Sequence, residues 1–312
     1  MSSESPLLPL VAAGPSLVEA FLAGRGPQTL RAYRTDLEQF AAYLGAPTPE
    51  AAVARLLSGG PGTANALVLG YRNHLIALGR SAASVNRPLA ALRSLVKLAR
   101  TLGLVTWSLE VPGLRAEPYR DTRGPGADGV RKLLAAAEGD TRRDRRDRAI
   151  LRLLYDLGLR RGEVAALDVD DVDLARGTVS VVGKGRTAKT LLTLAAPTRA
   201  ALAAWLEVRG SAPGPLFVNF DHSGKGASRR LTPNGIYRLV KTRGESAGVK
   251  VAPHGLRHTA ITEACKAAQA AGIGLEEVLD FSRHRDVKVL MIYRDRERNV
   301  QGTLAELVAE KA

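Results

Sequence analysis

The stretch at residues 252–260, APHGLRHTA, places three basic side chains within about one turn of an alanine-rich segment. His254 lies three positions before Arg257 and four before His258, a spacing that brings side chains onto one face of an α-helix. Such a group could bind an anion, bind a metal ion or serve only in packing. The rest of the sequence has to decide between these three possibilities.

Charge is the feature of the composition that says most about a partner. The 312 residues carry a formal net charge of +14, and 45% of them are hydrophobic, so a chain of this length predicts two folded domains. The excess of basic residues favours a polyanion such as DNA, because neutralising phosphates releases condensed counterions. An anionic membrane surface is the rival partner, but no run of 18 apolar residues and no basic, apolar leader is present. We therefore expect a cytoplasmic, nucleoid-associated protein that does not bind membranes.

Several kinds of metal or redox site are excluded or disfavoured by the residue types. The single cysteine, Cys265, cannot form an internal disulfide or a multi-cysteine zinc or iron–sulfur site. His254 and His258 could share a zinc ion, but no third ligand is evident. The acidic run at 167–177, LDVDDVDLARG, lacks the ligand spacing and closing glutamate of a calcium loop. We expect neither a metal nor a cofactor.

Hydrophobic periodicity divides the chain into a helical half and a mixed half. Within residues 15–105, apolar side chains recur at helical spacing, as in TLRAYRTDLEQFAAYLG at 29–45 and VNRPLAALRSLVKLARTLGLV at 85–105. Residues 106–127 contain three prolines and no sustained period, which is typical of a linker. In residues 128–312, Val179–Val181, the glycine-rich turn GKGRTAK and TLLTL predict a β-hairpin among helices. The predicted fold is mainly α with a small antiparallel β-sheet, and residues 1–14 form a flexible tail.

Cationic side chains of the second half lie next to predicted turns and helix ends. Together they could bind and cleave one phosphodiester. Guanidinium groups bind the non-bridging oxygens bidentately, a lysine can protonate a departing oxygen, and a tyrosine can be a covalent nucleophile. No carboxylate pair or nucleotide-binding glycine loop accompanies them. The six candidates are Arg160, Lys184, His254, Arg257, His284 and Tyr293.

These residues occur in motifs that resemble the tyrosine recombinases of the phage-integrase type. The matching segments are LGLRRGEVAAL, GKGRTAK, HGLRH and RHRDVKVLMIY, which follow one another in the family's order. His284 and Tyr293 are nine positions apart, the family's interval. The helical first half also resembles that family's core-binding domain, so the similarity spans roughly residues 15–310. It implies a helical DNA core-binding domain at 15–105 and an α+β catalytic domain at 128–312.

The resemblance implies a chemical role for each candidate. Tyr293 would attack a scissile phosphate to form a 3′-phosphotyrosyl link, while Arg160 and Arg257 hold the phosphorane. Lys184 would be the general acid, and the two histidines would bind the phosphate and assist proton transfer. No metal or nucleotide is needed for this reaction. The implied partner is double-stranded DNA with a specific recombination site. The resemblance also implies a tetramer that assembles on two such sites.

This sequence departs from the family pattern in two places. Arg283 stands where the family has a glycine before its second histidine. The interval from Arg257 to His284 is about one helical turn longer than usual, which puts the helix around residues 264–272 in question. The first arginine is doubled, and Arg160 is assigned because Glu163 follows it by three positions, so that Arg161 becomes a candidate contact to the DNA backbone.

DNA contacts outside the catalytic group are predicted from charge and polarity alone. Such contacts position a duplex without reading its sequence. The tail TLAELVAEK is predicted to be a helix that packs either on its own domain or on a neighbouring subunit. The candidate contacts of the first half are Thr29, Arg31, Arg34, Asn86, Arg87, Arg93 and Lys97.

Two other functions remain open on the sequence. A DNA-binding protein of the same fold could have lost catalysis, although the complete set of catalytic side chains argues against this. A type IB topoisomerase-like enzyme would use similar chemistry as a monomer. The small helical first half and the nine-residue interval between His284 and Tyr293 favour recombination.

Overall fold

A computed structural model shows two compact units, Met1–Tyr119 and Arg120–Ala312, which are described separately. The chain is described at residues 16–115, 124–183, 185, 188–220, 229–274, 276–284, 290 and 300–310. The predicted tail at 1–14 therefore lies outside the described residues.

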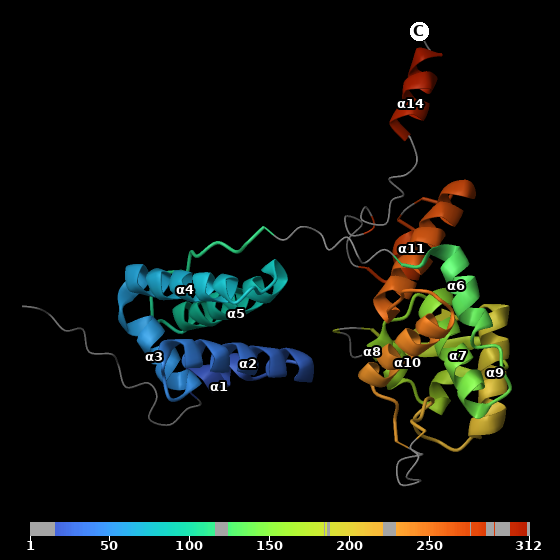
Figure 1. Cartoon of the computed structure of the whole chain (residues 1–312), viewed down its shortest axis with the longest axis horizontal. Helices are drawn as coiled ribbons and strands as arrows, with labels where there is room; N and C mark the ends of the chain where they lie inside the picture. The colour runs from blue at the N-terminus through green and yellow to red at the C-terminus, as the bar shows by residue number, and fades with distance from the viewer. Residues whose placement is uncertain are drawn as a thin grey trace, which may run out of the picture. The chain divides into compact units, whose positions relative to one another are not determined.

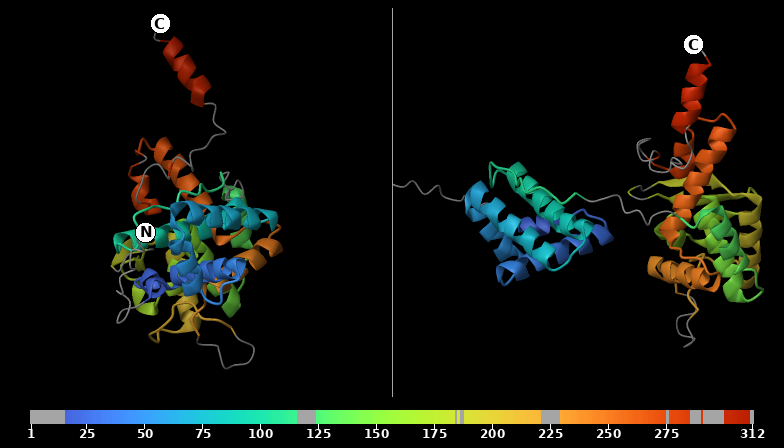
Figure 2. Two further views of the ribbon diagram at one scale, coloured as in Figure 1. Left: turned by 90° about the vertical axis from the view of Figure 1, so that its left-hand side faces the viewer. Right: turned by 45° about the horizontal axis from the view of Figure 1, so that its top comes forward.

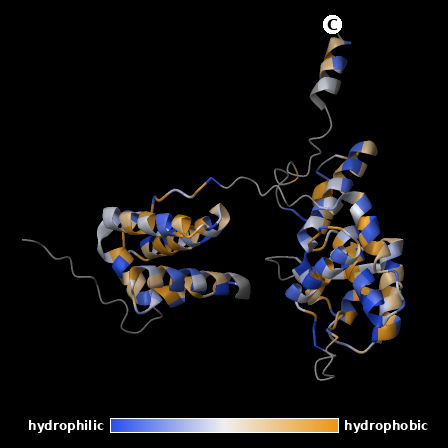
Figure 3. Ribbon diagram, viewed as in Figure 1, coloured by the Kyte–Doolittle hydropathy of each residue, from blue (hydrophilic) through white to orange (hydrophobic). Residues whose placement is uncertain are grey.

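The first unit is a bundle of helices around one apolar core (Figure 1). Phe40, Leu56, Val68 and Leu92 are almost completely buried in it, which accounts for the helical periodicity of the sequence. Figure 3 shows the same amphipathic alternation of polar and apolar residues along the ribbons. The described helices are α1 (Leu17–Leu22), α2 (Pro27–Leu44), α3 (Pro49–Ser58), α4 (Gly60–Ala77) and α5 (Ala82–Thr101).

Much of the predicted linker belongs to the first unit. Leu109 and Val111 are buried in its core. The side-chain amide of Asn86 makes two hydrogen bonds to the backbone of Leu114, at 2.7 and 2.8 Å, so the chain is held to α5 up to this point. The next described residues, from 124, lead into α6, which begins at Gly126, two positions before the predicted start of the catalytic domain. Only residues 116–123 separate the two described parts.

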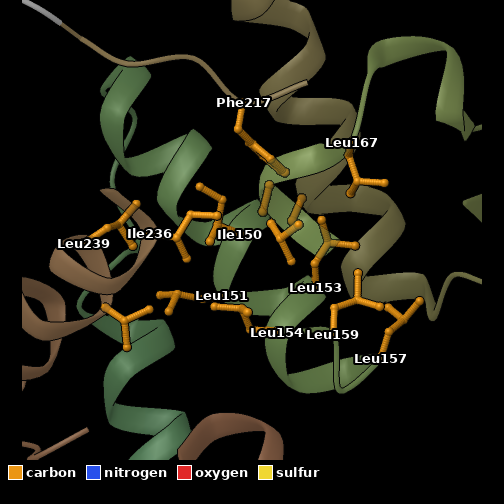
Figure 4. Packing of buried hydrophobic residues seen from close by; sticks show 14 of the residues in the cluster. Ile150, Leu151, Leu153, Leu154, Leu157, Leu159, Leu167, Phe217, Ile236 and Leu239 are labelled. Atoms are coloured by element: carbon orange, nitrogen blue, oxygen red, sulfur yellow. The ribbon is translucent and has the colours of Figure 1, made fainter. Parts of the chain in front are cut away.

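The second unit surrounds helix α7, which begins in a charged run and ends in an apolar one. Ile150, Leu153 and Leu154 are completely buried, and α9 packs along the helix (Figures 1 and 4). Its helices are α6 (Gly126–Ala135), α7 (Arg142–Asp156), α8 (Arg161–Ala166), α9 (Ala196–Arg209), α10 (Pro233–Ser246), α11 (Pro253–Ala270), α12 (Val278–Ser282) and α14 (Val300–Ala309).

The predicted hairpin is present and is part of a small sheet (Figure 2). Strands β2 (Thr178–Val182) and β3 (Lys189–Thr193) pair antiparallel, with Val181 opposite Thr190. A short strand, β1 (Val172–Asp173), adds to β2 after a 3₁₀ turn at Val169–Asp171, so the described residues form a three-stranded antiparallel sheet. The mainly helical fold with a small antiparallel sheet is confirmed.

The acidic run before the sheet is used in ion pairs. Asp171 accepts hydrogen bonds from Lys189 Nζ and from the backbone N–H of Asp168, and Asp168 pairs with Arg230. Helix α11 also continues without interruption to Ala270, so the segment that the longer interval put in question is a regular helix up to that residue.

Candidate active site

Arg160 lies at the junction between α7 and α8, where it is the N-cap residue of α8. Its backbone N–H donates to Glu163 Oε2 at 2.9 Å, and its guanidinium Nη1 donates to Glu163 Oε1 at 2.8 Å. The carboxylate is buried, whereas the Arg160 side chain is 31% exposed. Glu163 therefore fixes the direction of a guanidinium group that remains accessible to a ligand.

Arg257 lies in the first half of α11 and is only 2% exposed. Its guanidinium donates to the backbone oxygens of Gly158, after α7, and Ser282, at the end of α12. Its Nη2 also lies 3.2 Å from His284 Nε2. Arg257 thus connects the ends of two helices that are far apart in the sequence.

Neighbouring positive charge affects both predicted histidines. Burial, followed by the charges of Arg257, Arg160 and Arg283 and by His254, lowers the pKa of His284 to about 4. Loss of surrounding water, then Arg257 and Arg160, lowers the pKa of His254, although part of its side chain is exposed. Both imidazoles are therefore mainly neutral at pH 7, and each can accept a proton.

A third guanidinium group, that of Arg283, joins this cluster. Its Nη2 donates to Glu163 Oε2 at 2.9 Å, so Arg283 and Arg160 share one carboxylate. The structure thus brings Arg160, Arg257, His254 and His284 together. Lys184 and Tyr293 lie outside the described residues.

Three groups at the site were not identified from the sequence. The carbonyl oxygens of Gly158 and Ser282 hold Arg257, and the Ser282 hydroxyl accepts a hydrogen bond from the backbone N–H of His284 at 3.3 Å. Backbone acceptors carry no sequence signal of their own. Glu163 is noted in the sequence from its position three residues after Arg160, which is also the spacing of a capping box.

Some of the predicted DNA contacts are exposed. Arg161 is exposed, and its guanidinium lies over the ring of Tyr237 at 5.6 Å. On α2 and α5, the exposed candidates are Thr29, Arg31, Arg34, Arg87 and Lys97.

Other candidates on α5 already have partners within the first unit. Asn86 uses its amide to hold Leu114. Arg87 pairs with the buried carboxylate of Asp36 at 2.8 Å, although half of its side chain remains exposed. Arg93 is half-buried and donates to the backbone oxygen of Leu89. The structure therefore gives Asn86 a structural role, in which one N–H and the oxygen of its side-chain amide bind the backbone of Leu114.

Metal binding has no support in the described parts of the chain. Among those residues, no group of three or more His, Cys, Asp or Glu side chains is placed to hold an ion. His258 Nδ1 lies 3.5 Å from Thr262 Oγ1 on the next turn of α11. Cys265 is buried between α11 and α12.

Comparisons with known proteins show the family of the chain. The model of the phage integrase family matches residues 126–299, which is more than half of the chain. The chain belongs to the phage integrase family. This tyrosine recombinase is 37% identical over 293 residues to the tyrosine recombinase slr0733 of Synechocystis sp., with 92% of each chain covered. It is 35% identical to the tyrosine recombinase XerC of Pseudomonas fluorescens, with 86% and 85% of the two chains covered.

Solved structures support the fold of this recombinase. A lambda integrase (75–356) dimer bound to a core site has a TM-score of 0.65 at 17% identity, with 91% and 96% of the two chains covered. A lambda integrase tetramer bound to a Holliday junction also has a TM-score of 0.65 at 17% identity, with coverage of 91% and 78%. The family match and the identity to the two named tyrosine recombinases show that the chain is an enzyme that cleaves and rejoins DNA. In the described parts of the chain, no helix has the length and apolar character needed to cross a bilayer.

Proposed function

We propose that this recombinase exchanges strands between two specific double-stranded DNA sites through a 3′-phosphotyrosyl intermediate formed on Tyr293. The observation that carries the proposal is the gathering of Arg160 and Arg257 with two neutral imidazoles around the ends of α7 and α12. Glu163 pairs with Arg160, whose guanidinium nevertheless remains partly exposed. A phosphate diester is the kind of anion that such a basic cluster attracts.

The proposed reaction conserves the phosphodiester bond energy. The Tyr293 oxygen attacks phosphorus, the bond to the 5′ oxygen breaks, and Lys184 gives that oxygen a proton. A neutral imidazole, His254 or His284, accepts the phenolic proton. Arg160 and Arg257 bind the non-bridging oxygens most strongly in the transition state, because the negative charge on these oxygens is highest there. Attack by a 5′ hydroxyl of the partner duplex reverses these steps and needs no metal or nucleotide.

The proposed assembly is a tetramer on two DNA sites in the nucleoid of the cytoplasm. The net charge of +14 supports DNA as the partner. In the first unit, the exposed side chains on α2 and α5 are proposed to contact the phosphate backbone, together with Arg161 in the second unit. Val308 on α14 is 69% exposed, which is compatible with a helix that packs on a neighbouring subunit. The fold shared with the lambda integrase tetramer on a Holliday junction supports the same proposal.

A trapping experiment tests the chemistry. A duplex nicked beside its target site should give a covalent protein–DNA adduct with the wild-type enzyme and none with Tyr293→Phe. Tyr237→Phe is the matched control, because it removes a phenolic hydroxyl while it retains the ring beneath Arg161. An adduct that persists in Tyr293→Phe would exclude Tyr293 as the nucleophile.

The same preparation separates recombination from the alternatives. Relaxation of a supercoiled plasmid that has a single site, without joint products from two sites, would indicate topoisomerase-like activity. Salt-sensitive binding without an adduct on any tightly bound duplex would indicate a non-catalytic protein. Strand exchange that requires two sites supports the proposal.

A further inference from the structure

Arg283 has a backbone conformation that favours glycine. Its φ and ψ of 54° and 34° place it in the left-handed region at the C-cap of α12. It is the sole non-glycine residue with positive φ within the described ranges. A side chain in this conformation crowds its own carbonyl, so glycine would relieve the strain. The contacts of the arginine side chain must therefore offset the cost of this backbone conformation.

The guanidinium of Arg283 bonds to the groups that also hold the two predicted catalytic arginines. Only 9% of its side chain is exposed. Its Nη2 donates to Glu163 Oε2 at 2.9 Å and to the Gly158 oxygen at 3.3 Å, and its Nη1 lies 3.4 Å from the Leu157 oxygen. Glu163 also accepts from Arg160, and the Gly158 oxygen also accepts from Arg257.

We infer that Arg283 is a positioning residue, which joins α12 to the start of α8 so that Arg160, Arg257 and His284 keep one fixed geometry. The residue after Arg283 is His284, so the bridge to Glu163 sets the distance between this imidazole and Arg160. Shared use of the Gly158 oxygen links the bridge to Arg257. The guanidinium group acts through Glu163 and the backbone, and it need not contact DNA.

The inference rests on the proposed roles of Arg160 and Arg257 at the phosphate. It predicts a loss in the rate of cleavage without a matching loss in DNA affinity. A displacement of about 1 Å in a catalytic group can cost roughly 100-fold in rate. DNA affinity depends mainly on many phosphate contacts elsewhere, and we expect it to change by less than about threefold.

Two substitutions separate positioning from folding. Arg283→Gly removes the guanidinium and relieves the left-handed backbone, so it should melt no lower than Arg283→Met, which retains the strain. Both variants should form the covalent adduct about 100-fold more slowly than the wild type in single-turnover reactions with saturating DNA. Arg283→Gly that folds and reacts at the wild-type rate would overturn the inference.

Chemical rescue measures a change in cleavage rate that would not occur if Arg283 only stabilised the fold. Guanidinium ion added at millimolar concentration should accelerate Arg283→Gly severalfold, because the deleted side chain leaves space beside Glu163. Arg283→Met fills that space and should not respond. Equal responses of the two variants, or none in either, would contradict the inference.

The pH profile provides a second readout. Arg257, Arg160, Arg283 and His254 are the groups whose charge lowers the pKa of His284, together with burial. Loss of Arg283 should raise that pKa and move the acid limb of the cleavage rate to higher pH. An unchanged limb would count against positioning of His284 by Arg283. Adduct formation by Tyr293→Phe is measured in parallel. An adduct that persists in that variant would contradict the proposed function, whereas an unaffected Arg283→Gly would contradict only the role of Arg283.

Discussion

Replacement of Glu163 by glutamine tests the link between the buried carboxylate and catalysis. Glu163 is 4% exposed and accepts from the Arg160 backbone, the Arg160 guanidinium and the Arg283 guanidinium. Glutamine retains the shape but offers only one acceptor oxygen, and its amide group would face an N–H donor. Since Arg283 is buried, the amide oxygen should stay beside it while the more exposed Arg160 turns toward water.

The expected loss of stability follows from this rearrangement. Breaking a buried ion pair by removing one charge costs about 3–5 kcal/mol, and release of Arg160 to water favours the lower end, near about 3 kcal/mol. For a unit of this size, each kcal/mol lowers Tm by about 2–4 °C. The Glu163→Gln variant should therefore melt about 6–12 °C lower.

The two tryptophans of the chain allow this transition to be observed in the second unit alone. Trp205 is completely buried there and donates to the Leu216 oxygen, whereas Trp107 lies in the first unit. In a Trp107→Phe background, fluorescence reports only the environment of Trp205. A shift of less than about 2 °C would refute the assignment of Glu163 as the buried partner of both arginines.

Asp147→Asn provides a control for stability. Asp147 is 4% exposed and holds Arg146 at 2.8 Å and Arg243 at 2.9 Å, so its loss should cost a similar free energy. It lies ten residues before Leu157 along α7, about 15 Å from the candidate site. Well below both melting temperatures, Glu163→Gln should form the covalent adduct about 100-fold more slowly, whereas Asp147→Asn should stay close to the wild type. Equal losses would show that stability alone explains the effect.

Three further predictions concern protonation and the two ends of the linker. A bound phosphate should raise the pKa of His284 above about 4, so DNA binding should take up protons and strengthen as pH falls from 7 to 5. Calorimetry in buffers of different ionisation enthalpy measures this proton uptake, and the uptake should be lost in His284→Gln. Asn86→Ala removes both hydrogen bonds to Leu114 and should speed proteolysis after this residue roughly tenfold, as measured by mass spectrometry of timed digests. An unchanged rate would contradict the role of Asn86 in holding Leu114. A Cβ on Gly124 would overlap the Thr259 hydroxyl and the Gly255 backbone oxygen, so Gly124→Ala should destabilise the second unit by about 1–3 kcal/mol in urea melts. An unchanged midpoint would refute this close contact.

Local patterns predicted the elements whose side chains obey a simple period. The apolar residues of α2 and α5, and the alternation around Val179 and Val181, identify two helices and a hairpin from the sequence alone. The short strand β1 was missed because a two-residue strand has no period, and it is defined by its partner β2. The packing of the first part of the predicted linker could not be derived from the sequence, since Leu109 and Val111 become core residues only when the bundle has formed.

The candidate site was predicted as a set of residue types, whereas its geometry depends on tertiary contacts. Arg160 and Arg257 were recognisable from motif order, and Glu163 from its spacing. The backbone oxygens that orient Arg257 could not be recognised, because every residue has one. Arg283 was visible only as a departure from a glycine, and its bridge to Glu163 depends on how α12 meets α8.

The backbone partners of Arg257 explain how the chain can bury a cation at the site. An isolated buried charge is costly, and a carboxylate partner would cancel much of its attraction for a phosphate. The backbone oxygens of Gly158 and Ser282 carry only partial negative charge, so they accept hydrogen bonds from the guanidinium without supplying a full countercharge. Among the described side chains of the cluster, the guanidinium groups of Arg160 and Arg283 share one carboxylate, that of Glu163. The positive charge of Arg257 is therefore only partly compensated by these backbone oxygens, which supports the proposal that the site binds a phosphate.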